Sequence, residues 1–160
     1  MSVAFTREED VEAAAAFVPD RPVSPHPNNV TPAGLAALDE ALARARAAHQ
    51  AAQADGGVQG DRSAMALATR DLRYYASRRA SAQLIEPPTQ SDVVAFGGTV
   101  TFDRDDGRRQ TFRIVGEDEA DAARGSVSHV SPLARALLGK RVGDEAFVAG
   151  GEVLVVAVGR

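Results

Sequence analysis

Two stretches of the C-terminal half decide the fold, Phe112–Asp121 (FRIVGEDEAD) and Val130–Lys140 (VSPLARALLGK). The first predicts a strand that runs through a glycine into an acidic loop. In the second, Ser131 is a good helix N-cap, and Pro132 is favoured at the first helical position. The glycine that follows, Gly139, is typical of a helix C-terminus. The two stretches therefore predict a strand, a loop and a short helix in succession.

On both sides of these stretches the apolar residues recur with a period of two, which predicts β-strands. The run Asp103–Gly107 ends in an Asp-Gly pair and predicts a hairpin turn. Glu86–Thr89 (EPPT) marks a domain boundary. Residues 91–160 are therefore predicted to form an α+β domain, in which a twisted antiparallel sheet packs against one short helix. The expected strands are Val94 to Phe96, Thr99–Phe102, Gln110–Val115, Val127–Val130, Ala146–Val148 and Glu152–Val158.

The middle of the chain, residues 31–85, has the 3-4 apolar spacing of an antiparallel helical hairpin or coiled coil. Thr31-Pro32 is expected to open the first helix, and the Gly-rich run Asp55–Gly60 to end it. The second helix is expected from near Asp61 to about Gln83. Each arm of about 22 residues spans roughly 33 Å. The predicted seams are Leu35, Leu38, Leu42, Ala45, His49 and Ala52 on the first helix, and Met65, Ala68, Leu72, Tyr75, Arg79 and Ala82 on the second.

The first 30 residues are predicted to be a separate arm. Thr6 and Glu9 have the spacing of a capping box, which predicts a short helix as far as Ala15. Four prolines follow and favour an extended, semi-rigid linker. Two interpretations stay open: a loosely docked tail, or a segment that folds back and caps a partner site. The prolines are Pro19, Pro22, Pro25 and Pro27.

Composition excludes several classes of function. The chain has 160 residues and no cysteine, so disulfides, thiolate metal sites and a cysteine nucleophile are excluded. A net charge of −4 argues against general duplex-DNA binding. The three histidines, His26, His49 and His129, lack ligand spacing, and no metal or cofactor site is expected. No apolar run approaches the ~20 residues of a membrane span, and no signal-peptide pattern opens the sequence, so we expect a cytoplasmic location.

The strand-and-loop FRIVGEDEAD and the helix SPLARALLGK resemble, in the same order, the C-terminal domain of the bacterial GreA/GreB transcript-cleavage factor family. That resemblance implies an FKBP-like sheet domain that docks on RNA polymerase, preceded by a helical hairpin. It implies a monomeric regulator of transcription elongation rather than an enzyme, which meets nucleic acid only through the transcription complex. The resemblance covers Val93 to Gly159 most closely, the hairpin less closely, and the N-terminal arm not at all.

The resemblance also indicates which residues would meet the polymerase. The acidic loop and the start of the short helix lie next to the family's docking surface, and an exposed arginine there can pair with a carboxylate. The alternative for the loop is a solvated charge run, and for the helix simply a cover over the sheet. The candidate partner-binding residues are Asp118, Glu119, Asp121, Ser131, Pro132, Ala134 and Arg135.

In the family, the hairpin tip carries an Asp and, three residues later, a Glu, which help hold Mg²⁺ and a water in the polymerase active site. The family tip reads Gly-Asp-Arg-Ser-Glu-Asn, and residues 60–65 here read Gly-Asp-Arg-Ser-Ala-Met. Asp61 is kept and Ala64 replaces the Glu. Each arm is also about ten residues shorter than the family pattern, which withdraws the tip by ~15 Å. The sequence therefore predicts a regulator that does not stimulate transcript cleavage.

Three alternatives remain beside that prediction. Asp61 could still support cleavage, with the polymerase Mg²⁺ as the metal and Asp55 as a substitute for the missing carboxylate. Asp61 could also be no more than a helix cap. The remote third alternative is a prolyl isomerase, because the family domain is FKBP-like. Its pocket would be lined by Phe96, Phe102, Phe112 and Phe147.

Overall fold

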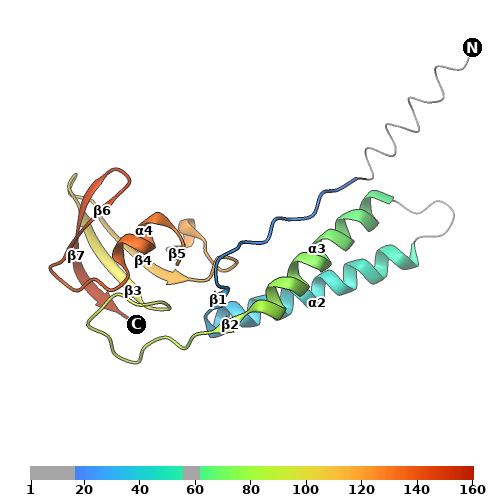
Figure 1. Cartoon of the computed structure of the whole chain (residues 1–160), viewed down its shortest axis with the longest axis horizontal. Helices are drawn as coiled ribbons and strands as arrows, with labels where there is room; N and C mark the ends of the chain where they lie inside the picture. Colours follow the sequence, from blue (N-terminus) through green and yellow to red (C-terminus); the bar gives the residue numbers. More distant parts are fainter. Residues whose placement is uncertain (1–16, 56–61) are drawn as a thin grey trace, which may run out of the picture. The chain divides into compact units, whose positions relative to one another are not determined.

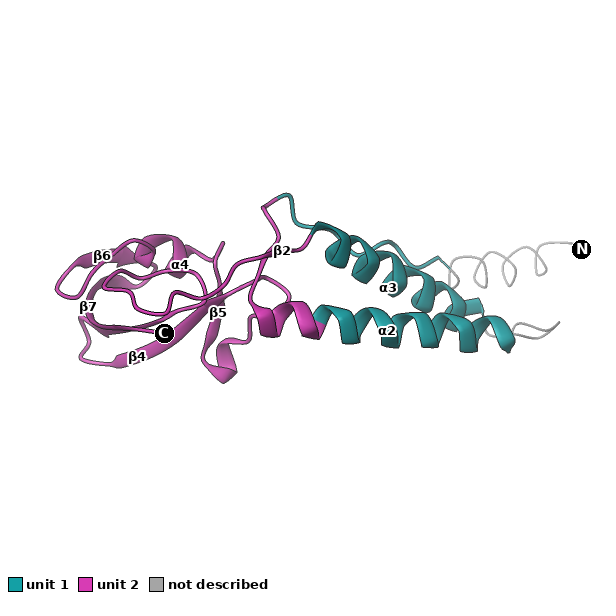
Figure 2. Ribbon diagram, turned by 90° about the horizontal axis from the view of Figure 1, so that it is seen from below, with its two compact units in different colours: residues 1–25, 38–81 teal, residues 26–37, 82–160 magenta. Residues whose placement is uncertain are grey.

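The computed structural model describes residues 17–55 and 62–160, which form two compact units (Figures 1 and 2). We call residues 17–25 with Leu38–Ser81 the hairpin unit, and His26–Ala37 with Ala82–Arg160 the sheet unit. The predicted helix between Thr6 and Ala15, the Gly-rich run that follows Asp55, and Asp61 lie outside the described residues. In the part of the chain that the structure describes, no helix is both long enough and apolar enough to cross a membrane.

Helix α2 (Pro32–Ala54) begins where the Thr-Pro pair predicted. The Thr31 hydroxyl oxygen accepts a hydrogen bond from the Gly34 N–H at 3.0 Å, which satisfies one of the amides left unpaired at a helix start. The predicted seam is confirmed at Leu38, Leu42 and Ala45, whose side chains are buried. The first turns of α2 belong to the sheet unit and the remainder to the hairpin unit (Figure 2).

Helix α3 (Arg62–Ser81) lies beside α2, and Ala68 is its buried apolar residue. Two seam positions differ from the prediction, and the first is Ala82, which lies beyond the last residue of α3. Arg79 is not enclosed between the helices, because its guanidinium pairs with the Asp39 carboxylate of α2 and stays at the rim of the seam. Its neighbour Arg78 is buried instead, with 2% of its surface exposed.

The described part of the N-terminal arm contacts α3 mainly through polar side chains. The Arg21 guanidinium lies 3.8 Å from the centre of the Tyr74 ring and 3.6 Å from the Asp71 carboxylate. Asp20 pairs with Arg73 at 3.4 Å. A hydrogen bond to Tyr75 is the largest cause that raises the pKa of Arg21. The arm therefore lies on the hairpin through charge and aromatic contacts, while Phe17 remains 76% exposed.

The sheet unit contains a five-stranded sheet in the order β5-β4-β3-β7-β6. The α+β class is confirmed, but the sheet is mixed rather than wholly antiparallel, because β5 runs parallel to β4. A parallel neighbour needs a crossover in place of a tight turn, and the acidic loop with the 3-10 helix η1 (Ala122–Arg124) supplies it. The strands are β3 (Thr99–Arg104), β4 (Arg109–Val115), β5 (Ser126–Ser128), β6 (Glu145–Val148) and β7 (Gly151–Gly159).

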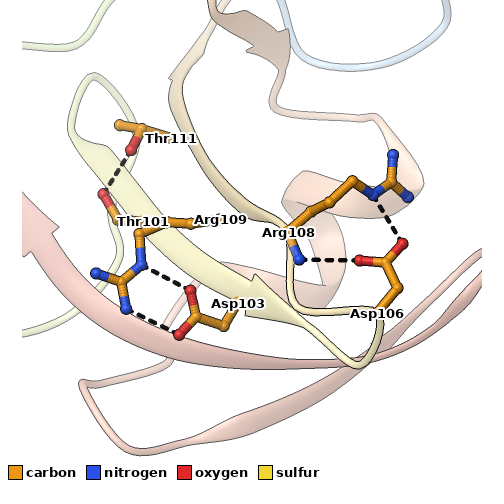
Figure 3. A network of polar contacts seen from close by, with 6 residues as sticks. All are labelled: Thr101, Asp103, Asp106, Arg108, Arg109 and Thr111. Atoms are coloured by element: carbon orange, nitrogen blue, oxygen red, sulfur yellow. Dashed lines mark hydrogen bonds and ion pairs between the residues drawn. The ribbon is translucent and has the colours of Figure 1, made fainter.

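The turn between β3 and β4 forms where the Asp-Gly pair predicted it, with Gly107 in the left-handed region at φ +84°. A bidentate pair joins Arg109 to Asp103 across the strands, at 2.7 and 2.9 Å (Figure 3). The hydrogen bond from Arg109 is the main cause that lowers the pKa of Asp103. Within the turn, Asp106 accepts hydrogen bonds from the backbone and side chain of Arg108, and the backbone bond is the larger cause that lowers its pKa.

The core of the sheet unit lies between the sheet and helix α4 (Pro132–Leu137). Phe102 and Ile114 are fully enclosed, and Leu137 of α4 packs against them with 1% of its surface exposed. A second, two-stranded parallel sheet pairs β1 (Asn29–Val30) with β2 (Gln83–Leu84), on either side of the hairpin sequence. The strand predicted from Val94 to Phe96 is absent from the described structure, and Val94 is instead a buried core residue outside the strands.

Candidate partner-binding surface

The acidic loop begins at Gly116, directly after β4, and its three predicted docking acids have different roles. Glu119 is engaged inside the chain: its Oε2 accepts a hydrogen bond from the Thr31 hydroxyl at 2.6 Å. Asp121 caps η1 by accepting from the Ala123 N–H at 3.1 Å. Asp118 is exposed. Of these acids, Asp118 and Asp121 are exposed, whereas Glu119 is only partly exposed.

The start of α4 follows the predicted capping pattern. The Ser131 side chain accepts a hydrogen bond from the Ala134 N–H at 3.1 Å, and Pro132 occupies the first turn. Pro132 and Arg135 are exposed. Among the described residues, no ion pair involves the Arg135 guanidinium, so that cation is available to a carboxylate of a partner.

Ala134 must be removed from the predicted docking residues. Its surface is 0% exposed, because it shares the inner face of α4 with Leu137 and packs into the core. Positions three apart on a helix lie on the same face, so the residue that covers the sheet cannot also meet a partner. Asp118, Asp121, Pro132 and Arg135 remain as the exposed members of the predicted surface.

Sequence reasoning missed Thr31 and Gly34 as partners of the acidic loop. Thr31 was assigned only as a helix cap, and Gly34 was not considered. The two ends of the Thr31–Glu119 hydrogen bond are 88 positions apart in the chain. Periodicity and capping signals are local, so neither could have indicated this contact.

At the hairpin, the structure describes Ala64 but not Asp61. Ala64 lies in the first turn of α3 and is exposed. A methyl group offers no oxygen to a hard cation such as Mg²⁺. Within residues 17–55 and 62–160, no group of three or more His, Asp or Glu side chains could hold a metal ion.

The four phenylalanines of the sheet unit do not converge on a pocket. Phe102 is enclosed in the core and stacks on Phe112, with ring centres 6.2 Å apart. Phe96 meets the edge of His129, and Phe147 is 79% exposed. An aromatic-lined isomerase pocket would need these rings to face one cavity, so the geometry gives no support to that activity.

The family model and the relatives found by sequence agree on one family. The family model "Transcription elongation factor, GreA/GreB, C-term" matches residues 89–158. The transcription elongation factor GreA of Desulfovibrio desulfuricans is 38% identical over 130 residues, which cover 72% of this chain and 80% of that protein. GreB of Neisseria meningitidis is 46% identical over 78 residues, or 48% of each chain. The crystal structure of GreA factor homolog 1 from Thermus thermophilus aligns with 83% of this chain and 99% of its own, at 25% identity and a TM-score of 0.38.

The strand, the acidic loop and the capped helix all lie within the residues that the family model matches, so the sheet unit is the C-terminal domain of a transcription elongation factor. The chain belongs to the GreA/GreB family. The chain spans most of the length of the D. desulfuricans relative but about half of the N. meningitidis one.

Proposed function

We propose that this protein binds RNA polymerase through its sheet unit, acts at the secondary channel as an elongation regulator, and does not stimulate transcript cleavage. It has no catalytic activity of its own in this proposal. Family membership supports the polymerase as the partner. The exposed side chains of Asp118, Pro132 and Arg135 support the sheet unit as the docking part.

The observation that carries the loss of cleavage is Ala64. The GreA/GreB resemblance implies a carboxylate at this position, three residues after Asp61, to help hold Mg²⁺. Asp61 alone is one ligand, and a single carboxylate does not preorganise a metal site. The two arms have 23 and 20 residues, and the resemblance implies family arms about ten residues longer, so the shorter reach supports the same conclusion.

Docking is tested by charge reversal of Arg135. In a direct binding measurement with core polymerase, Arg135→Glu should weaken the affinity by roughly 1.5–3 kcal/mol, because it replaces a charge-assisted contact with a repulsive one. Arg160→Glu is the matched control, since Arg160 is an exposed arginine of the same unit. An affinity that Arg135→Glu leaves unchanged would show that this face of α4 does not meet the polymerase.

Cleavage is tested on a backtracked polymerase complex with Mg²⁺. The full chain should release no cleavage product above the polymerase background, and should slow a genuine cleavage factor by competing for the same site. Ala64→Glu separates the two causes. If the missing carboxylate is the only defect, that variant gains activity; if the short arms also matter, both arms must be lengthened as well.

The second candidate is an active cleavage factor that uses Asp61, which the kept Gly-Asp-Arg-Ser sequence favours. It predicts robust cleavage by the unmodified chain and its loss in Asp61→Ala. That pair of results would replace the first proposal, while polymerase binding would stand in either case.

A further inference from the structure

The Glu119 side chain packs against the first turn of α2, and Thr31 hydrogen-bonds both to Glu119 and to that turn. The Thr31 hydroxyl donates to Glu119 Oε2 at 2.6 Å, and the same oxygen of Thr31 accepts from the Gly34 N–H at 3.0 Å. Thr31 is fully buried. A buried hydroxyl that donates and accepts at once holds both partners in one geometry, because either bond lost would leave a buried polar atom unsatisfied.

Gly34 provides the space that the carboxylate occupies. A Cβ at this position would lie 2.5 Å from Glu119 Oε2, closer than real Cβ contacts come. Any other residue would therefore displace the carboxylate from the helix start. A carboxylate at that place also interacts favourably with the helix dipole and with the unpaired amides of the first turn.

A second close approach fixes the segment just before α2. A Cβ at Gly116, the first residue of the acidic loop, would lie 2.5 Å from the backbone oxygen of Asn29. The same segment pairs with β2 through hydrogen bonds from the Gln83 N–H to the Asn28 oxygen, at 2.8 Å, and from the Ile85 N–H to the Val30 oxygen, at 2.9 Å. Asn28 and Val30 are 4% and 3% exposed. Gly116 and Glu119 of the acidic loop therefore both lie against the segment that leads into α2.

We propose that Glu119 is a positioning residue that holds the start of α2, and that the acidic loop is a joint between the docking surface and the first turn of α2. Asp118, on the exposed side of the loop, is one residue from Glu119, on its inner side. If Asp118 contacts the polymerase while Glu119 holds the start of α2, docking and the position of the helix start are coupled. The regulatory part of this inference rests on the proposed polymerase binding; the joint itself does not.

The sign of one substitution tests the joint in the full chain. Helix propensity alone favours Ala over Gly, so Gly34→Ala should raise the thermal unfolding midpoint if nothing else changes. The joint predicts the reverse, because the new methyl group expels the Glu119 carboxylate. In a Glu119→Ala background the clash is gone, and Gly34→Ala should then raise the midpoint. This reversal within a double-mutant cycle is specific to the contact.

Amide hydrogen exchange gives an independent readout on the same protein. Glu119→Ala should speed the exchange of the amides of residues 34–38 by about tenfold, since local opening then lacks one charge-assisted hydrogen bond. Glu86→Ala, which removes an exposed carboxylate of the same unit, should leave these rates unchanged. Glu119→Gln, which still accepts from Thr31, should lie in between.

Polymerase assays then separate positioning from docking. As a positioning residue, Glu119→Ala should keep the affinity for core polymerase within about twofold and lose most of the effect on elongation. A stabilising Gly34→Ala in the native background, or unchanged exchange in Glu119→Ala, would overturn the joint. Equal losses of affinity and effect would make Glu119 a docking residue instead. If the native chain fails to bind polymerase, the proposed function fails, while the midpoint reversal and the exchange rates still decide the joint.

Discussion

The two units use apolar residues in different ways. In the sheet unit, Phe102, Ile114 and Leu137 are enclosed on every side by strands and by α4. Among the described residues of the hairpin unit, the buried apolar side chains are the leucines Leu38 and Leu42 and two alanines. Since stabilisation scales with the apolar area removed from water, the sheet unit has the larger driving force for folding. The difference teaches that the sheet unit is stabilised mainly by its apolar core, whereas packing holds the hairpin unit only weakly.

The hairpin unit compensates with polar contacts at its surface. Arg79 pairs with Asp39 between the two helices, and Arg21 of the arm lies over Tyr74 and beside Asp71. Exposed ion pairs contribute typically 0–1 kcal/mol each, so several of them replace only part of a missing core. The hairpin is therefore expected to open at lower free energy than the sheet.

The largest expected effect comes from the same substitution made in each unit. Leu137→Ala should lower the free energy of unfolding by about 3–5 kcal/mol, because it leaves a cavity in a densely packed core. Leu42→Ala should lower it by only about 2 kcal/mol, because small neighbours let the seam close. Chemical denaturation of the full chain measures both. Equal losses would break the contrast between the units.

The seams and strands that this contrast depends on could largely be predicted from the sequence. A repeat of 3-4 spacing marked Leu38, Leu42 and Ala45, and an Asp-Gly pair marked the turn at Gly107. The direction of β5 could not be predicted, since a three-residue strand carries no information about its partner.

The candidate surface was less predictable than the fold. The cap at Ser131 and the exposure of Pro132 and Arg135 follow the helix pattern, and their contact with a partner stays a prediction. Ala134 is a core residue, because a small residue at a helix start fits either role. The role of Glu119 depends on a contact with a residue 88 positions away. Long-range contacts of this kind arise from packing of the whole unit and have no local signal.

A peptide of residues 31–83 tests whether the hairpin can fold without the sheet unit. We expect low helicity and a broad, non-cooperative thermal transition by circular dichroism, because helices with small seams depend on tertiary packing. The full chain, measured under the same conditions, is the control. High helicity with a sharp transition would mean that the seam suffices, or that two peptides associate through it.

The N-terminal arm contributes less to the stability of the hairpin unit than the core leucines do. Arg21→Ala should destabilise the hairpin unit by about 0.5–1 kcal/mol, through loss of the cation–π contact with Tyr74 and the ion pair with Asp71. Limited proteolysis should then cut the segment from Phe17 to Pro25 faster than in the native chain. Arg46→Ala, an exposed arginine of α2, is the matched control. Equal rates in both variants would show that the arm is held by other contacts.

The smallest expected effect concerns a repulsion within the more stable unit. Glu145 and Glu152 lie on the neighbouring strands β6 and β7, and the negative charge of Glu145 is the largest cause that raises the pKa of Glu152. A hydrogen bond between the two carboxyl groups acts in the same direction. An acid whose pKa is higher in the folded state binds its proton more tightly there, so its ionisation at neutral pH opposes folding.

Removing that charge should therefore stabilise the sheet unit slightly. Glu152→Gln should raise the thermal midpoint at about pH 7, and the gain should vanish at about pH 3, where Glu152 is protonated in both the folded and the unfolded chain. Asp103→Asn is the matched control with the opposite sign. Arg109 lowers the pKa of Asp103, so that pair stabilises the fold above the ordinary carboxyl pKa and ceases to as the pH falls through the lowered value. Its loss should lower the midpoint at about pH 7 and matter less in acid. If both variants shift the midpoint in the same direction at neutral pH, the charges of the Glu145–Glu152 and Asp103–Arg109 pairs do not account for the effects of the substitutions.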